Sequence, residues 1–209
     1  MVHRHSTHTK TISPMEIRPA VLSDCRVVAE LALMAGEGIP AFFWAQNQQP
    51  GQDIIDVGAS NLKSETENFS YRNVHVAIIG GEIAGMLLAY RLPEADDAEN
   101  LDELPEFIRP LVELEQFVPG SFYINMIATF PAHRNRSVGS ALMGIVDQLA
   151  IKAGCDEISI EVFEQNEGAL RLYKRLGYTQ KATRDIIPHG SHPYQGKIVL
   201  LTRPVNAQA

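Results

Sequence analysis

The feature of the sequence that most constrains its fold is an alternation of strand-like and helix-like segments between residues 122 and 176. Residues 122–129 form an apolar run typical of a strand, and residues 138–153 repeat apolar residues at helical spacing up to Gly154. Residues 157–163 and 169–176 predict a second strand and a second helix, which Gly177 ends. Such alternation indicates a mixed sheet that is covered by helices.

The flanking segments add further strands and helices to this unit. Before residue 93 we expect a short strand over 17–20, a helix that Ser23 or Asp24 caps, a short helix or apolar lid over 39–45, and a helix over 53–64. Two strands follow over 75–79 and 83–90, joined by a turn of Gly80, Gly81 and Glu82. Near the end of the chain we expect a new strand after Tyr178 and a last strand over 198–201. Residues 93–119 interrupt this pattern, because they are acidic at first and then amphipathic. We expect an inserted loop and helix there, which form a wall of a binding site, an oligomer contact or a solvated connection with one packed helix.

Length, charge and cysteine content limit the class of protein. With 209 residues, of which 45% are hydrophobic, we expect one domain over 15–203 between a polar leader (1–14) and a short tail (204–209). The net charge of −7 argues against a nucleic-acid or anionic-membrane partner. No apolar run approaches the roughly 20 residues that span a bilayer. The two cysteines, Cys25 and Cys155, form no disulfide framework, which favours the cytoplasm.

Three histidines near the start, His3, His5 and His8, could bind a metal ion. A disordered polar leader explains them better, so we expect no metal.

The polar turn between residues 129 and 138 has the chemistry of a phosphate site. The start of a helix leaves free backbone N–H groups that carry a partial positive charge. Arg134 and Arg136 add full charges, and the small residues Ser137, Gly139 and Ser140 let phosphate oxygens approach the backbone. An ordinary strand–turn–helix junction with surface arginines is the alternative for this turn taken alone.

A second segment begins 27 residues after Gly139. Asn166 is a good helix N-cap, and Ala169 and Tyr173 follow on one side of the predicted helix. A phenol with a pKa of about 10 is protonated at neutral pH and can donate to a sulfur atom. The alternative is that Tyr173 only packs in the core.

Together the two segments resemble the signature segments of the GNAT acyltransferases, the Gcn5-related N-acetyltransferase superfamily. The turn is similar to the pattern Arg/Gln-x-x-Gly-x-Gly/Ala from Arg134 to Gly139, and the second segment to Asn-x-x-Ala-x-x-x-Tyr-x-x-x-Gly-Tyr/Phe from Asn166 to Tyr178. The resemblance implies a mixed α/β domain whose twisted, mostly antiparallel sheet has splayed middle strands. It also implies transfer of an acetyl group from acetyl-coenzyme A to a primary amine, by direct attack in a ternary complex.

The resemblance further implies roles for individual residues. Tyr173 would protonate the departing thiolate, and Asn166 would hydrogen-bond the pantetheine arm or its phosphate side. Backbone groups of the strand before the turn would pair with that arm, and an amide there would face the thioester oxygen. The residues expected to bind acetyl-coenzyme A are Ile127, Ala128, Thr129, Arg134, Asn135, Arg136, Ser137, Val138, Gly139, Ser140, Asn166, Ala169 and Tyr173.

The turn departs from the family pattern at Ser137, where Gly is usual. If this position requires a positive φ, a Ser would cost on the order of 1 kcal/mol and could crowd the phosphate. Asn135 also stands where many members have Gly, but Asn tolerates left-handed geometry better than most residues.

Neither segment defines the general base or the amine acceptor. The candidates for the acceptor site are Glu37, Trp44, Tyr71, Tyr123 and Asn125, with Glu161 and Glu164 as further candidate bases. Each could instead be a packing or surface residue. We expect a small-molecule acceptor rather than a protein, and an isologous homodimer is the default assembly. Two other functions fit the sequence: a non-catalytic acyl-coenzyme A sensor, and a scaffold that associates through residues 101–114.

Overall fold

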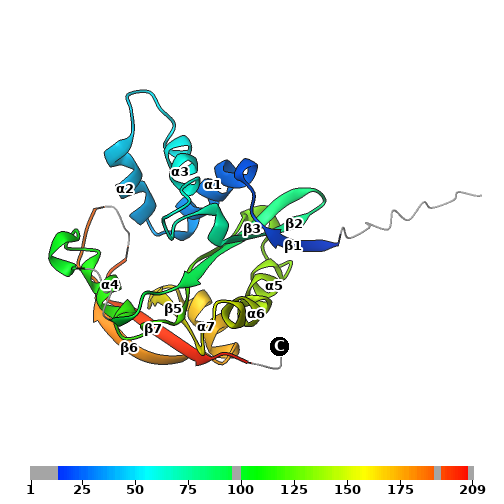
Figure 1. Cartoon of the computed structure of the whole chain (residues 1–209). Coiled ribbons are helices and arrows are strands. Elements are labelled where there is room, and N and C mark those ends of the chain that lie inside the picture. The colour runs from blue at the N-terminus through cyan, green and yellow to red at the C-terminus, as the bar shows by residue number, and fades with distance from the viewer. Residues whose placement is uncertain (1–13, 96–99, 191–193, 207–209) are drawn as a thin grey trace, which may run out of the picture.

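The computed structural model describes residues 14–95, 100–190 and 194–206. Its centre is an open seven-stranded sheet with the order β1-β2-β3-β4-β5-β7-β6 (Figure 1). All neighbouring strands are antiparallel except β4 and β5, which are parallel. The mixed, mostly antiparallel sheet expected from the sequence is therefore confirmed. The histidines of the leader lie outside the described residues.

The strands are β1 (Met15–Pro19), β2 (Val74–Ile79), β3 (Glu82–Arg91), β4 (Phe122–Thr129), β5 (Glu157–Phe163), β6 (Thr179–Asp185) and β7 (Lys197–Pro204). The α-helices are α1 (Cys25–Ala35), α2 (Ile39–Asn47), α3 (Ile54–Leu62), α4 (Arg109–Glu115), α5 (Val138–Gly144), α6 (Val146–Lys152) and α7 (Glu167–Arg175). Helices α1 to α3 lie on one side of the sheet and α5 to α7 on the other (Figure 1). Each group shares a separate hydrophobic core with the sheet face that it covers.

The parallel pair at the centre of the sheet is short. Pairing between β4 and β5 covers only Phe122 to Ile124 on β4, opposite Ile158 to Ile160 on β5. At the same place β4 has one extra residue relative to β3, because Leu88 pairs with Met126 while Ala89 pairs with Ile124. Asn125 is therefore a β-bulge, which bends its strand and changes the local twist. The two central strands diverge beyond this bulge, so the predicted splay is confirmed.

Two predicted elements differ from the structure. The helix expected over 138–153 is divided at Ile145 into α5 and α6. Asp24 stands at the N-cap position of α1, but its side chain makes no capping bond. Its carboxylate instead accepts from the Val21 amide (2.8 Å) and from Arg18 (2.6 Å). The Arg18 guanidinium carries a full positive charge, so it attracts the carboxylate more strongly than a helix N–H group does.

The strand expected after Tyr178 is β6, whose bounds the sequence did not predict. Its residues are mostly polar and their burial follows no strict alternation, since this strand lies at an edge of the sheet. Period-2 patterning is strongest where one face is buried, so a largely exposed edge strand carries little of that signal.

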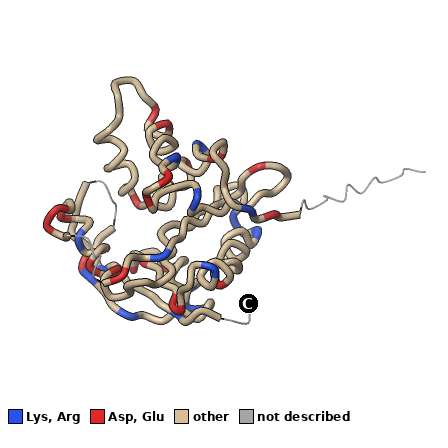
Figure 2. The backbone as a smooth tube through the Cα atoms, viewed as in Figure 1, with Lys and Arg blue, Asp and Glu red and all other residues tan. Residues whose placement is uncertain are grey.

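The insertion at residues 93–119 packs its helix against the sheet. Leu114 of α4 is fully buried, and Arg184 of β6 donates from Nε to Glu113 of the same helix (2.6 Å). The Arg184 guanidinium also lies 5.0 Å from the Phe117 ring centroid. The segment that leads into α4 is rich in acidic residues (Figure 2). The insertion thus places an acidic, anchored helix beside the splayed strands.

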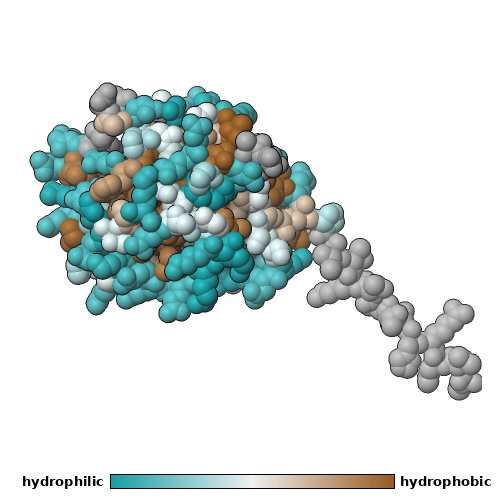
Figure 3. All heavy atoms as spheres, turned by 90° about the horizontal axis from the view of Figure 1, so that it is seen from below, coloured by the Kyte–Doolittle hydropathy of each residue, from teal (hydrophilic) through white to brown (hydrophobic). Residues whose placement is uncertain are grey.

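None of the helices in the described part of the chain is long and apolar enough to cross a membrane. On the face seen in Figure 3, hydrophobic residues form small groups between hydrophilic ones.

Candidate active site

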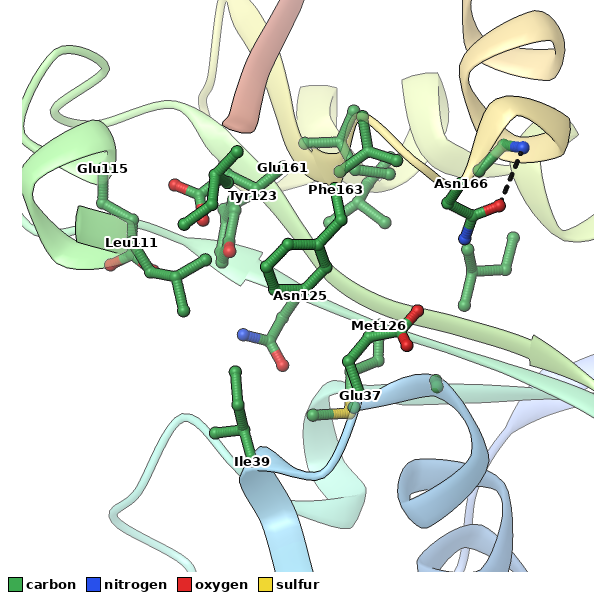
Figure 4. Close-up of a pocket in the computed structure, with 18 of the residues that line it drawn as sticks. Glu37, Ile39, Leu111, Glu115, Tyr123, Asn125, Met126, Glu161, Phe163 and Asn166 are labelled. Carbon is green, nitrogen blue, oxygen red and sulfur yellow. Dashed lines mark hydrogen bonds between the residues drawn. The ribbon is translucent and has the colours of Figure 1, made fainter. Parts of the chain in front are cut away.

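A cavity opens in the sheet where β4 and β5 diverge. Its volume is about 250 Å³, and its lining comes from β4, β5, α7, α4 and the connection between α1 and α2 (Figure 4). We call the part formed by Asn166, Ala169 and Tyr173 the α7 side. The part that contains Glu115 and Glu161 is called the acidic side.

The polar turn before α5 has a positive φ at Ser137, the position where the sequence departs from the Gly of the family pattern. Asn135 and Ser137 have φ angles of 59° and 61°, in the left-handed region. Ser137 is the N-cap of α5 and makes no side-chain capping bond. Successive amides in such a turn form a concave site for anions. Arg134 and Arg136 are both exposed beside it, with one Arg136 guanidinium nitrogen 3.2 Å from His133 Nδ1.

The edge of β4 beyond the bulge faces the gap between the strands. Ile127, Ala128 and Thr129 pair with β3 on one side, while the pairing of β4 with β5 has already ended at Ile124. Backbone groups on a strand edge that lacks a neighbouring strand can bind an extended ligand, as an additional strand would. Ile127 also lines the cavity, so this edge and the cavity are continuous.

The α7 side has the arrangement that its motif predicts. The Asn166 side-chain oxygen accepts from the Ala169 amide (3.2 Å), which confirms the N-cap (Figure 4). The Tyr173 side chain reaches the cavity although the residue is only 5% exposed. Burial raises the pKa of the Tyr173 hydroxyl above its usual value, so this group stays protonated at neutral pH.

The acidic side is centred on Glu161 of β5. Both carboxylate oxygens of Glu161 are inaccessible to solvent, and neither has a hydrogen-bond partner in the described chain. Burial and the charge of Glu115 raise the pKa of this carboxyl well above its usual value. The Tyr123 hydroxyl lies near enough to oppose the rise, but no hydrogen bond of ordinary geometry joins the two groups. Tyr123, Glu115 and Glu161 come together from β4, α4 and β5 (Figure 4).

Glu37 reaches the cavity from the connection between α1 and α2. Its φ angle is 54°, an uncommon conformation for a non-glycine residue that costs roughly 1 kcal/mol or more. Burial raises the pKa of the Glu37 carboxyl, and a hydrogen bond with Tyr194 opposes that rise. A strained, partly buried carboxyl at a cavity is typical of a functional position rather than of a packing one.

The fold places the other candidate acceptor residues at different sites, and only some of them line the cavity. Asn125 lines the cavity and donates from its side-chain nitrogen to the Tyr90 hydroxyl (3.2 Å). Trp44 is 3% exposed and lines a neighbouring open pocket, which also contains Asn125. Tyr71 lies in a 3-10 turn and packs against the core under α1 and α3. Glu164 is exposed beyond the end of β5. Neither Tyr71 nor Glu164 is among the residues that line the cavity.

An aromatic cluster joins α2, the segment before α4 and the β6–β7 connection. The ring of Phe107, before α4, stacks on His189 of the β6–β7 connection with centroids 4.0 Å apart. Phe42 of α2 meets both rings edge-on, at 4.9 and 5.2 Å. The cluster holds these three segments together.

Glu115 is the site residue that the sequence analysis missed. The only signal available was its spacing of four residues from Leu111 on the amphipathic helix of the insertion, and both residues line the cavity. That spacing predicts a shared helix face but not what the face contacts.

Comparisons with known proteins agree with this geometry. A sequence model of the acetyltransferase (GNAT) family matches residues 40–178. N-alpha-acetyltransferase MAK3 of Arabidopsis thaliana is 36% identical over 56 residues, which is 27% of this chain and 30% of that protein. The chain thus spans less than a third of the length of the curated relatives that it matches.

Solved structures share the fold across nearly the whole chain. A crystal structure of an acetyltransferase has a TM-score of 0.65 and 20% identity, and covers 91% of this chain and 100% of its own. An N-acetyltransferase from Staphylococcus aureus Mu50 has a TM-score of 0.59 and 20% identity, with 90% and 100% covered. The family match spans more than half of the sequence, and the motifs lie together at the splayed strands. This chain therefore belongs to the GNAT acetyltransferase family.

Proposed function

We propose that this protein is an N-acetyltransferase that transfers the acetyl group of acetyl-coenzyme A to a primary amine, by direct attack in a ternary complex. The observation that carries the proposal is the cavity at the β4–β5 divergence. It connects a side with a buried, protonated tyrosine to a side with carboxylates. Acetyl transfer requires a base that takes the proton of the amine and an acid that protonates the departing thiolate, on opposite sides of the reacting atoms.

The chain has the groups needed to hold acetyl-coenzyme A, whose thioester supplies an activated acetyl group. The left-handed turn at Asn135 and Ser137, with Arg134 and Arg136, would bind the pyrophosphate. The free edge of β4 at residues 127–129 would bind the pantetheine arm, with the side-chain amide nitrogen of Asn166 as a further donor. A backbone N–H of this edge would also stabilise charge on the thioester oxygen.

Two side chains would move the protons. The Glu161 carboxylate would accept the proton of the acceptor ammonium, because a carboxyl with a raised pKa is a stronger base than an ordinary one. The Tyr173 hydroxyl would donate its proton to the departing sulfur. No covalent enzyme intermediate is required, and both cysteines are buried free thiols. Buried free thiols also support a reducing compartment such as the cytoplasm.

The relatives named N-alpha-acetyltransferases make a protein N-terminus the competing acceptor class. We favour a small amine, because the carboxylates line a cavity of only about 250 Å³.

The first test is thermal unfolding with increasing acetyl-coenzyme A, with ATP as a control that shares the adenosine and phosphates but lacks the pantetheine arm. A ligand at about 100 times its Kd adds roughly 2.7 kcal/mol to the free energy of unfolding. We expect a saturating rise in Tm with acetyl-coenzyme A alone, followed by release of coenzyme A thiol when an amine is added. A Tm that does not respond would reject the proposal. A rise in Tm without thiol release from any amine would favour a non-catalytic sensor.

A further inference from the structure

The charged residues that line the cavity all have the same sign. Among the described residues of its lining, Glu37, Glu115 and Glu161 are the charged ones, and no Lys, Arg or His joins them. A buried carboxylate is usually paired with a cation or fully hydrogen-bonded, because leaving it alone is energetically costly. The two oxygens of Glu161 have neither kind of partner in the described chain. Burial and the charge of Glu115 raise the pKa of this carboxyl and so favour its neutral form, and a cationic ligand would supply the positive charge that the ionised form lacks.

The acids lie at two ends of the cavity rather than in one group. Figure 4 shows Glu37 on one side, and Glu115 and Glu161 together on the other. Apolar side chains form the wall between them: Ile39, Leu111, Met126 and Phe163. A ligand that fits this pattern is positively charged at both ends and apolar in the middle.

The surroundings strengthen the preference for cations. The segment that leads into α4 carries Asp102, Glu103 and Glu106, and the chain has a net charge of −7 (Figure 2). A cleft lined by one sign of charge concentrates ligands of the opposite sign and raises their association rate. An α-amino acid would bring its carboxylate into this field, and a neutral peptide would bring one positive charge only.

We propose that the acceptor is a linear aliphatic diamine or polyamine. Its reactive amine lies at the Glu115–Glu161 end, where Glu161 takes the proton, and its second ammonium binds Glu37. The methylene chain lies along the apolar wall between the two ends. This inference rests on the proposed acetyltransferase function and names its substrate class.

The experiment compares α,ω-diamines with alkylamines of the same chain length, over three to six carbons. Each is assayed by thiol release from acetyl-coenzyme A. For the wild-type protein we expect kcat/KM to be at least about tenfold higher for the best diamine than for its monoamine. Alanine amide and a short neutral peptide serve as single-charge competitors.

Glu37→Gln is the decisive variant, because Gln has the same size and keeps the backbone conformation of Glu. It should reduce the diamine preference to about one, chiefly through a higher KM for the diamine. Glu113→Gln is the matched control: it removes an α4 carboxylate that pairs with Arg184 of β6 and does not line the cavity. It should keep the full preference.

The outcomes separate this inference from the function on which it rests. Equal activity with monoamines, a higher kcat/KM for the neutral peptide, or an unchanged preference in Glu37→Gln would overturn the diamine assignment and leave the acetyltransferase standing. A diamine that raises the Tm of the wild-type protein but not of Glu37→Gln, without any acetylation, would support recognition of the diamine and reject catalysis.

Discussion

The two sides of the cavity are built in different ways. The α7 side and the phosphate turn come from short contiguous segments, and much of their chemistry is backbone: left-handed residues, a strand edge and a helix cap. The acidic side is built from side chains of α4 and β5, which are distant in sequence. A backbone site tolerates side-chain changes, whereas a side-chain site depends on each of its groups. Substitutions on the acidic side should therefore have the larger effects on turnover.

The largest effect is expected for Glu161→Gln, which removes the proposed base and should lower kcat by roughly 10² to 10⁴-fold. The same change should raise the Tm at neutral pH. The folded-state pKa of Glu161 lies above its ordinary value of 4.5, so its ionisation opposes folding as pH rises beyond that value. The gain in Tm should disappear at about pH 4, where the carboxyl is protonated in both states. Glu164→Gln, on an exposed residue outside the cavity, is the control for the loss of one charge.

Tyr173→Phe should reduce kcat by about 10²-fold, because the thiolate would leave without a proton donor. Tyr178→Phe is the matched comparison, since that ring is also buried, lies 6.0 Å from the Tyr173 ring and does not line the cavity. Equal kcat values for the two variants would remove Tyr173 from the mechanism and make its role one of packing.

Asn166→Ala should lower stability by about 1 kcal/mol through loss of the helix cap, and should raise KM for acetyl-coenzyme A. Asn166→Asp separates these effects, because it keeps the capping oxygen and removes the amide donor. We expect the Asp variant to recover the wild-type Tm but not the wild-type KM. Recovery of both would mean that Asn166 serves the helix alone.

The smallest effect is expected for Ser137→Gly, at the left-handed position in the phosphate turn. Gly adopts a positive φ without the strain of a Cβ atom, so the free energy of unfolding should rise by up to about 1 kcal/mol. Acetyl-coenzyme A should bind several-fold more tightly. Ser137→Ala keeps the Cβ atom and should give neither gain, and a similar gain in both variants would contradict the role of backbone strain.

Local patterns predicted much of the fold and nearly all of the α7 side. Strands β4 and β5 have the predicted bounds, and Asn166 caps α7 as its motif predicts. The largely exposed edge strand β6 and the break at Ile145 were not predicted, because neither leaves a clear periodic signal in the sequence. Among the acids that line the cavity, Glu37 and Glu161 were two candidates among several, and Glu115 was missed.

By itself, the sequence determined the family, the order of strands and helices, and the segments proposed to bind acetyl-coenzyme A. Each of these depends on residues within one strand, turn or helix, where spacing decides which groups share a face. The tertiary structure alone decided which acids line one cavity. Glu37, Glu115 and Glu161 lie far apart along the chain. Their convergence depends on the bulge at Asn125 that separates β4 from β5 and on the packing of α4 over the sheet.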